Sequence, residues 1–361
     1  MNRSKIEWCD HTWNPITGCR HECPYCYART MTARFAGDVR LNKMAKADYQ
    51  LVNAEDGRKK SEAVYYLEKP MLNETGKALV YPFGFEPTYH RYRMDTLDKL
   101  KMGNNIFVGA MADIFGAWVP EKWIIDIFNV CTKRPQHNYM FLTKNPERYL
   151  ELYATGKLPE ADNLFYGATV TQGVQLERAT KVFTDLPDGF RTFFSIEPIL
   201  EDIAAKEIWQ KAVLQTDWII IGAQTGRSKD KVVPEMDWIR KIVVSADTAY
   251  GVPVFMKDSL IPIAGEPNMR RDFPKQLQHS EISPKMKKKL FDVCADCKNQ
   301  LKKSDMITLL ARSKRGEQPK QFGFMCKECF KKFCEGLGLD IPKLEELAES
   351  ITIGPGDSED G

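Results

Sequence analysis

Six short apolar runs, each followed by a helical pattern, constrain the fold of this chain more than any other feature. The runs are Ile106–Val108, Tyr139–Leu142, Leu164–Tyr166, Thr192–Phe194, Trp218–Ile221 and Val252–Phe255. Strands that alternate with helices predict a parallel sheet with crossover helices. With a seventh run before Cys19, the pattern predicts an α/β fold, a full or partial (β/α) barrel. In such barrels the chemistry lies at the carboxyl ends of the strands.

For two of the intervening helices, the sequence contains a signal for the first turn. Pro120 suits the first turn of a helix, and the stripe behind it contains Ile124, Ile127, Phe128 and Cys131. Asn145-Pro146 predicts the start of the next helix, with Asn145 as its cap.

The length and the cysteine content of the chain limit the classes of protein to which it can belong. A chain of 361 residues predicts one large domain with a small appendage. We expect no secretory signal, because residues 1–10 hold no apolar run, and no stretch of about 18–20 apolar residues would span a membrane. We therefore expect a cytoplasmic protein, in which ten cysteines point to metal sites rather than disulfides.

Cys19, Cys23 and Cys26 have the spacing C-x3-C-x2-C on one short segment. Three thiolates can hold three irons of a [4Fe–4S] cube, whereas a ferredoxin-like electron carrier supplies four. The fourth iron then stays open to a substrate or cofactor. The alternative is a zinc site completed by His11 or His21.

This spacing, with Tyr25 before the third cysteine, resembles the signature of the radical S-adenosylmethionine (SAM) superfamily. The resemblance implies that the open iron binds SAM. It also implies an electron donor, such as flavodoxin or ferredoxin, and a 5′-deoxyadenosyl radical that abstracts hydrogen from a substrate.

A wider resemblance extends over residues 1–36 and 105–260. The chain is similar to a phage- and mobile-element-associated, three-cysteine family of radical SAM-like proteins. The matching segments are Ile6–Trp8, Thr12–Pro15, Gly18-Cys19, Cys26–Ala28, Met111–Phe115, Leu142–Lys144, Pro146–Arg148, Ser195–Pro198, Asp217–Gly222 and Val252–Phe255. The chain departs from many relatives at Cys9, where they have threonine, and at Gly222–Gly226, where they have Gly-Gly-Glu-Ser-Gly.

Most of these segments follow an apolar run, so their polar residues are expected at the carboxyl ends of strands. Asp113 is expected to accept a hydrogen bond from the SAM amino group, and Lys144 to pair with its carboxylate. Gly222 is expected to let the backbone approach adenine. The other predicted SAM contacts are Tyr25, Thr169, Thr171, Gln172, Ser195 and Glu197. Any one of these polar residues is alternatively a solvated loop residue or a helix cap.

Residues 37–104 are rich in aromatic and charged side chains without clear periodicity, which predicts an insertion covering one face of the barrel. His90 and Arg91 lie there between Tyr89 and Tyr92, an interleaving that can bind a nucleic acid or nucleotide. Gln224 and Lys257 are the other predicted substrate contacts. The alternative for the 89–93 segment is a surface loop with packed tyrosines.

Two cysteine pairs near the C-terminus, Cys294-x2-Cys297 and Cys326-x2-Cys329, predict a zinc ribbon over residues 285–335. An auxiliary [4Fe–4S] cluster is the alternative. Residues 285–332 hold fourteen Lys or Arg against five Asp or Glu, which favours nucleic-acid contact, although a protein-docking module has the same charge. Residues 340–361 predict a short helix and a disordered acidic tail.

Together these features predict a radical SAM enzyme that acts on a nucleic-acid base or nucleotide. One alternative is a radical SAM enzyme that modifies a peptide or partner protein. The other is a non-catalytic iron–sulfur and zinc protein that binds nucleic acid.

Overall fold

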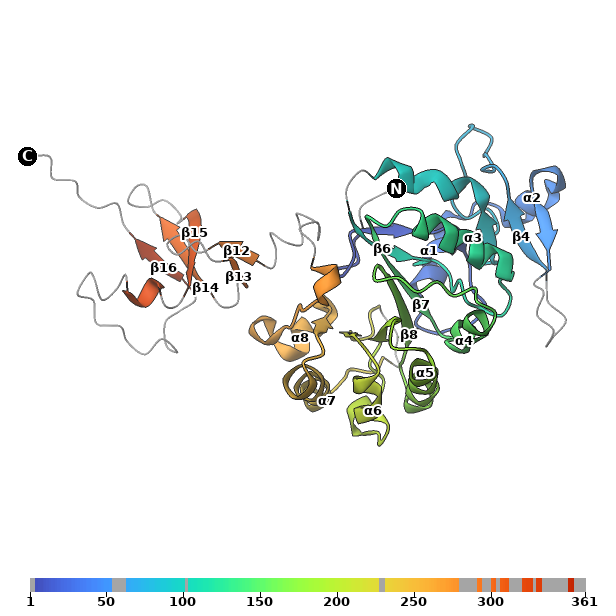
Figure 1. Ribbon diagram of the computed structural model, residues 1–361. Coiled ribbons are helices and arrows are strands. Elements are labelled where there is room, and N and C mark those ends of the chain that lie inside the picture. Colours follow the sequence, from blue (N-terminus) through green and yellow to red (C-terminus); the bar gives the residue numbers. More distant parts are fainter. Residues whose placement is uncertain are drawn as a thin grey trace, which may run out of the picture. The chain divides into compact units, whose positions relative to one another are not determined.

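The computed structural model divides into two units, residues 1–282 and 283–361. The structure describes residues 4–53, 63–100, 103–226, 231–278, 291–293, 300–302, 306–311, 320–326, 329–332 and 350–353. Figure 1 shows both units as ribbons, and each is treated separately below.

Seven parallel strands form one sheet in the larger unit (Figure 1). In order across the sheet they are β1 (His11–Trp13), β6 (Asn105–Val108), β7 (Asn138–Thr143), β8 (Leu164–Thr169), β9 (Arg191–Ile196), β10 (Trp218–Ile221) and β11 (Val254–Met256). The sheet curves into a half-barrel, open between β1 and β11. The six apolar runs are thus confirmed as strands, and of the two predicted barrels the partial one forms.

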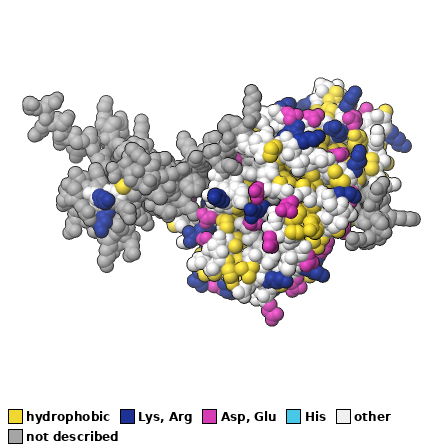
Figure 2. Space-filling model, in the orientation of Figure 1, with side chains coloured by type: hydrophobic (Ala, Val, Ile, Leu, Met, Phe, Trp, Pro, Cys, Tyr) yellow, Lys and Arg dark blue, Asp and Glu magenta, His cyan; other side chains and the backbone are white. Residues whose placement is uncertain are grey.

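Helices cover the outer face of the sheet (Figure 1). They are α3 (Glu121–Thr132), α4 (Glu147–Ala154), α5 (Gly173–Asp185), α6 (Trp209–Leu214), α7 (Met236–Val243) and the short α8 (Ile261–Ala264). Ile127 and Phe128 of α3 are buried against outward-facing strand residues such as Phe141, so the predicted stripe is confirmed. Charged side chains are spread over the surface, with hydrophobic ones between them (Figure 2). No helix in the described ranges has the length and apolar character to cross a membrane.

The predicted cap of α4 is wrong. Pro146, not Asn145, occupies the N-cap position, and it makes no side-chain cap bond. The Asn145 amide instead donates to the carbonyl oxygen of Phe115 at 2.8 Å. The side chain therefore holds the loop that follows β6 rather than its own helix.

Large apolar side chains fill the concave face of the half-barrel. They come from alternate strand positions and include Phe107, Met140, Phe165, Phe193, Trp218 and Phe255. Parallel strands buried on both faces are expected to be apolar throughout. Gly167 belongs to the same layer, and a side chain at this position would collide with Phe193, because a Cβ there would be 2.3 Å from the ring.

The first described residues close the concave side. Trp8 and Cys9 are buried against the inward aromatic layer, together with Phe273 from beyond β11. Glu7 accepts a hydrogen bond from the backbone N–H of Asp258 at 3.1 Å. The segment before β1 is thereby joined to the segment after the last strand.

A second sheet carries the chain between β1 and β6. Its order is β2 (Ile16–Thr17), β5 (Thr88–His90), β4 (Val64–Leu67) and β3 (Gln50–Val52). Helices α1 (Tyr27–Phe35) and α2 (Val39–Met44) also belong to this part of the chain. Tyr89 stacks on Trp123 of α3 with ring centroids 4.8 Å apart, which attaches the sheet to the half-barrel.

The smaller unit contains β12 (Phe291–Val293), β13 (Gln300–Lys302), β14 (Met306–Ala311), β15 (Lys320–Cys326) and β16 (Ser350–Ile353). Cys294 and Cys297 lie outside the described residues; Cys326 ends β15 and Cys329 is buried. The zinc ribbon therefore stays a prediction. The strand β16 pairs parallel with β14 within the region predicted as a helix and disordered tail.

Gly167 and Phe193 provide a test of the concave layer. Gly167→Ala is expected to lower the free energy of unfolding by about 1–3 kcal/mol, because the ring must move aside. In a double-mutant cycle, adding Phe193→Leu should recover part of that loss, with a coupling of about 0.5–3 kcal/mol. Denaturant titration of the four proteins measures it, and additive losses would contradict the contact.

Candidate metal and cofactor site

The three-cysteine loop runs from β2 to α1 and is anchored at its start. Gly18 has φ +88°, and a Cβ there would be 2.3 Å from the carbonyl oxygen of Glu86, so only glycine fits. Its N–H donates to Met111 at 2.8 Å, and the N–H of Cys19 donates to Phe85 at 3.1 Å. The loop therefore begins attached both to the segment after β6 and to the segment before β5.

The thiols of Cys19, Cys23 and Cys26 are free and partly exposed. Burial raises the pKa of Cys19 to about 12, and the charges of Asp113, Cys23 and Cys26 raise it further. Burial also raises the pKa of Cys23, while the nearby Lys144 ammonium lowers it. Metal binding must therefore displace protons from these thiols, since the thiolate is the ligand. Among the described residues, no three His, Cys, Asp or Glu side chains are arranged around one metal-ion position.

Asp113 is a buried carboxylate that ties the loop to the half-barrel. Its oxygens hydrogen bond to His21 Nε2 at 2.6 Å, the Thr143 hydroxyl at 2.7 Å and the Phe115 N–H at 3.0 Å. A fourth bond comes from the N–H of Lys144 at 2.9 Å. Burial works to raise the pKa of Asp113, but the hydrogen bonds from His21, Lys144 and Thr143 outweigh it and lower the pKa.

The expected bond from Asp113 to the SAM amino group does not fit this geometry. Four protein donors already occupy its two oxygens. Asp113 is instead a tether that joins His21, between the first two cysteines, to the carboxyl end of β7.

Lys144 extends the inward-facing positions of β7 beyond the end of that strand. Its ammonium donates to the Tyr25 hydroxyl at 3.1 Å and lies 5.3 Å from the centroid of the ring. The predicted SAM contacts Lys144 and Tyr25 are therefore brought together beside Cys23. Together they form the polar edge of the site nearest the loop.

Glu197 and Lys257 form an ion pair across the ends of β9 and β11, with both side chains mostly buried. A Cβ on Gly222 would come within 3.2 Å of the Glu197 side chain. The Tyr27 hydroxyl donates to the carbonyl oxygen of Ala110 at 2.7 Å, and desolvation of this hydroxyl, together with the Glu197 charge, raises the pKa of Tyr27, the residue after Cys26, although its ring is half exposed. The loop and the distant strands thus meet around Glu197.

The other predicted SAM contacts lie on the same rim. Thr169 ends β8 and is in register with Ser195 of β9. Gln172 precedes α5 without capping it by a side-chain bond. Thr171 donates to the Gln175 side chain at 2.9 Å. Of this group, Thr169 and Ser195 are the pair that the sheet places side by side.

Protein partners occupy the ring of His90, and Arg91 is exposed. His90 is buried, and its ring nitrogens hydrogen bond to Thr17 at 2.8 Å and Tyr92 at 3.1 Å. It thus packs the second sheet and has no nitrogen left for a substrate. Arg91 is exposed near Tyr66 and Tyr89, the tyrosines that contact α3. Gln224 accepts from the N–H of Val232 at 3.3 Å.

A family model described as "Protein of unknown function (DUF5131)" matches residues 3–260. The chain belongs to the DUF5131 family. The match includes all seven strands of the half-barrel and the three-cysteine loop. Comparisons with curated proteins and with solved structures gave no match.

Sequence reasoning missed the link between His21 and Asp113 in this DUF5131 chain. The two residues are 92 positions apart, and no spacing rule joins them. It also missed the Glu197–Lys257 pair. The direction of Glu197 could have been predicted from the alternation of side chains along a strand. Phe193, Ser195 and Glu197 are two positions apart, so they point to the same side, and Phe193 faces the concave side.

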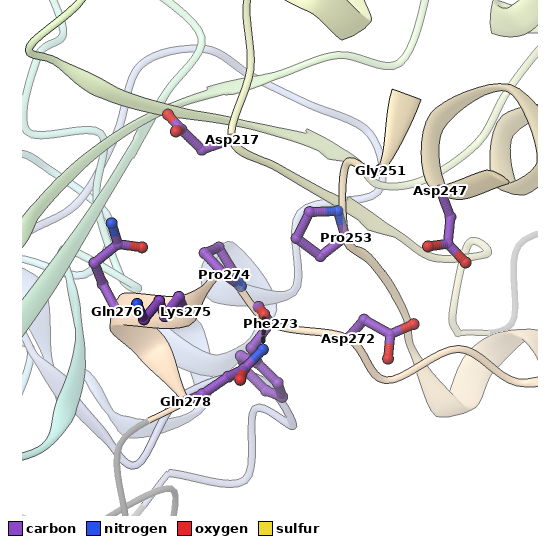
Figure 3. Close-up of a pocket in the computed structure, with 10 residues that line it drawn as sticks. All are labelled: Asp217, Asp247, Gly251, Pro253, Asp272, Phe273, Pro274, Lys275, Gln276 and Gln278. Atoms are coloured by element: carbon purple, nitrogen blue, oxygen red, sulfur yellow. Dashed lines mark hydrogen bonds between the residues drawn. The ribbon is translucent and has the colours of Figure 1, made fainter. Parts of the chain in front are cut away.

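The half-barrel also has a cavity of about 410 Å³ at the amino ends of β10 and β11. Figure 3 shows Asp217 and Pro253, which immediately precede these strands, among its lining residues. Asp217 is paired with Arg191 and Asp247 with Arg270. The cavity lies at the opposite strand ends from the three cysteines, and none of the predicted SAM contacts lines it.

The tether gives a prediction about the loop. Asp113→Asn is expected to lower the free energy of unfolding by about 1–3 kcal/mol, because an NH2 group that cannot accept replaces one of two buried oxygens that both accept from protein donors. It should also speed hydrogen exchange at the amides of residues 18–26. Asp162→Asn is the control, because this exposed carboxylate forms a surface ion pair with Arg191, worth about 0–1 kcal/mol. Equal exchange in both variants would contradict the tether.

Proposed function

We propose that this DUF5131 protein is a radical SAM enzyme that holds a [4Fe–4S] cluster on Cys19, Cys23 and Cys26. The observation that carries the proposal is the position of these cysteines. They lie on one loop at the carboxyl rim of a parallel half-barrel. Lys144, Glu197 and Lys257 lie at the same rim, each directly after the last residue of a strand. That rim is where (β/α) barrels carry their chemistry.

The donor set fits an iron–sulfur cluster. Three cysteine thiols on one loop can each bind one iron of a cube, which leaves one iron for another ligand. All three thiols are partly exposed, so irons can reach them. The Lys144 ammonium stabilises negative charge at Cys23. When bound, such a cluster would supply the electron that cleaves the SAM sulfonium.

The residues around the loop suit the polar parts of SAM. Lys144 offers an ammonium for the carboxylate of SAM, and Tyr25 holds it beside the loop. Glu197 offers acceptors for ribose hydroxyls, and Gly222 leaves space beside it. Below them the buried aromatic layer of Phe193 and Trp218 keeps water from the concave side. A dry site protects a reactive radical from side reactions.

A nucleic-acid base or nucleotide is the proposed substrate. The support is the net charge of +9 over residues 285–332, which attracts polyanions. Most of residues 285–332 lie outside the described residues. The choice of a nucleic-acid substrate therefore rests on sequence charge and not on the geometry of the rim. A peptide substrate, or a non-catalytic role in nucleic-acid binding, is the outcome if oligonucleotides neither bind nor stimulate SAM cleavage.

Metal content tests the cluster. Anaerobic reconstitution should give about four irons at the N-terminal loop, with the visible absorption of a cubic cluster. Cys23→Ala should abolish both, since the thiolate is a ligand. Cys131→Ala and Cys9→Ala are the controls, because both cysteines are buried in the half-barrel and burial raises the thiol pKa. Loss of iron in Cys9→Ala would show that the ligand set is misassigned.

SAM affinity tests the rim. Lys144→Ala and Glu197→Gln should each raise the dissociation constant for SAM about tenfold, which corresponds to about 1.4 kcal/mol. Iron content should stay at the wild-type value. Lys211→Ala on α6 is the matched control, because this lysine is exposed on the outer helix layer. Calorimetric titration with SAM measures the affinities, and unchanged values in both rim variants would move the SAM site elsewhere.

A further inference from the structure

Helix α1 leaves most of its surface in solvent. Of its nine residues only Ala28 and Thr32 are buried. Tyr27, Met31 and Phe35 are spaced four apart, so they lie along one face of the helix. They are 51%, 43% and 56% exposed. An exposed apolar face of this kind marks an interaction site.

Helix α2, which follows α1 in the chain, also exposes apolar side chains. Leu41 and Met44 are 60% and 75% exposed. The Asn42 amide donates to the carbonyl oxygen of Ala36 at 3.3 Å and to that of Pro82 at 2.7 Å. These bonds fix α2 against the end of α1. The α1–α2 face, as used below, consists of Tyr27, Met31, Phe35, Leu41 and Met44.

The helices that carry the α1–α2 face have a net positive charge. Residues 27–44, which span both helices, contain four cations and one acidic residue, Asp38. The Asp38 carboxylate caps α2 by accepting from the N–H of Arg40 at 2.9 Å. Arg29 lies 4.8 Å from the centre of the Phe85 ring, and Lys43 lies 5.8 Å from that of Tyr65. The other cations of the two helices are Arg34 and Arg40, and Arg40 pairs with Asp38 at 3.6 Å.

We infer that the α1–α2 face is the docking surface for a small acidic electron-transfer protein. The inference rests on the proposed function, because it assigns a route for the electron that the cluster needs. Helix α1 begins at the residue after Cys26, so a protein on this face lies next to the metal loop. In the step, the donor loses one electron and the cluster gains one. No atom passes between them.

The composition of the face favours a protein over other occupants. Exposed Met, Tyr, Phe and Arg are the residue types enriched at protein interfaces. A nucleic acid would pair with the cations but leave the aliphatic Met31, Leu41 and Met44 without contacts. A second copy of the chain would bring two basic surfaces together, which like-charge repulsion disfavours. An acidic protein with an apolar centre matches both features.

Direct binding to the full chain is the first test, with flavodoxin as an acidic one-electron donor. Phe35→Glu and Arg34→Glu should each raise the dissociation constant for flavodoxin at least about tenfold, since one removes apolar contact and both repel an acidic partner. Val174→Glu on α5 and Lys211→Glu on α6 are matched controls, which place the same new charge on exposed positions of the outer helices. Wild-type binding should weaken as salt rises.

Cluster reduction is the second readout. Reduced flavodoxin should reduce the clusters of the two face variants at least about tenfold more slowly than that of the wild type. Dithionite, a small reductant that needs no docking surface, should reduce all of them equally.

The two proposals fail in distinguishable ways. A chain that binds flavodoxin through this face but holds no iron would overturn the proposed function and not the surface. Equal flavodoxin binding by face and control variants, in a chain with about four irons, would overturn the docking surface alone. Loss of oligonucleotide binding or of dimerisation in the face variants, with flavodoxin binding intact, would assign the face to a nucleic acid or a second copy instead.

Discussion

Burial on both faces of the seven-stranded sheet is the constraint on which the rest of the structure depends. The outer face packs against helices, and the concave face is filled by aromatic side chains together with Trp8 and Phe273. An unpaired polar group in either layer would cost about 1–3 kcal/mol. Polar chemistry is therefore excluded from the middle of the strands and concentrated at their ends. This explains why Lys144, Glu197 and Lys257 all follow the last residue of a strand.

The three-cysteine loop depends on that rim for its shape. Its backbone includes Gly18, at φ +88°, and Glu22, at φ 54°. Glu22 is the one non-glycine residue with positive φ within the described ranges. A left-handed conformation costs a non-glycine residue roughly 1–2 kcal/mol. The Asp113–His21 bond next to Glu22 supplies a compensating interaction, so the loop is held by the half-barrel rather than by its own sequence preference.

The sequence predicted the strands well because each is a short apolar run buried on two sides, a pattern independent of distant residues. It predicted the rim residues for a related reason, since a residue that follows such a run must lie at a strand end. It failed where long-range contacts decide the outcome. Asn145 has the local sequence of a helix cap, but its side-chain amide donates to the carbonyl oxygen of Phe115. His90 has the local sequence of a surface ligand, but its ring nitrogens hydrogen bond to Thr17 and Tyr92. The aromatic residues 49–89 showed no period because they pack against one another and against α3.

The bond between Glu7 and Asp258 spans 251 positions, which sets an order of events during synthesis. Trp8 cannot be fully buried until Trp218 of β10, whose ring it contacts, has been made, so the half-barrel stays unclosed while the intervening chain is synthesised. At about 5–20 residues per second, that interval is on the order of 10–50 s. Cys19, Cys23 and Cys26 leave the ribosome at its beginning. Their thiols therefore meet iron, zinc or oxidants of the cell well before the carboxylate that will hold their loop is packed in a finished sheet.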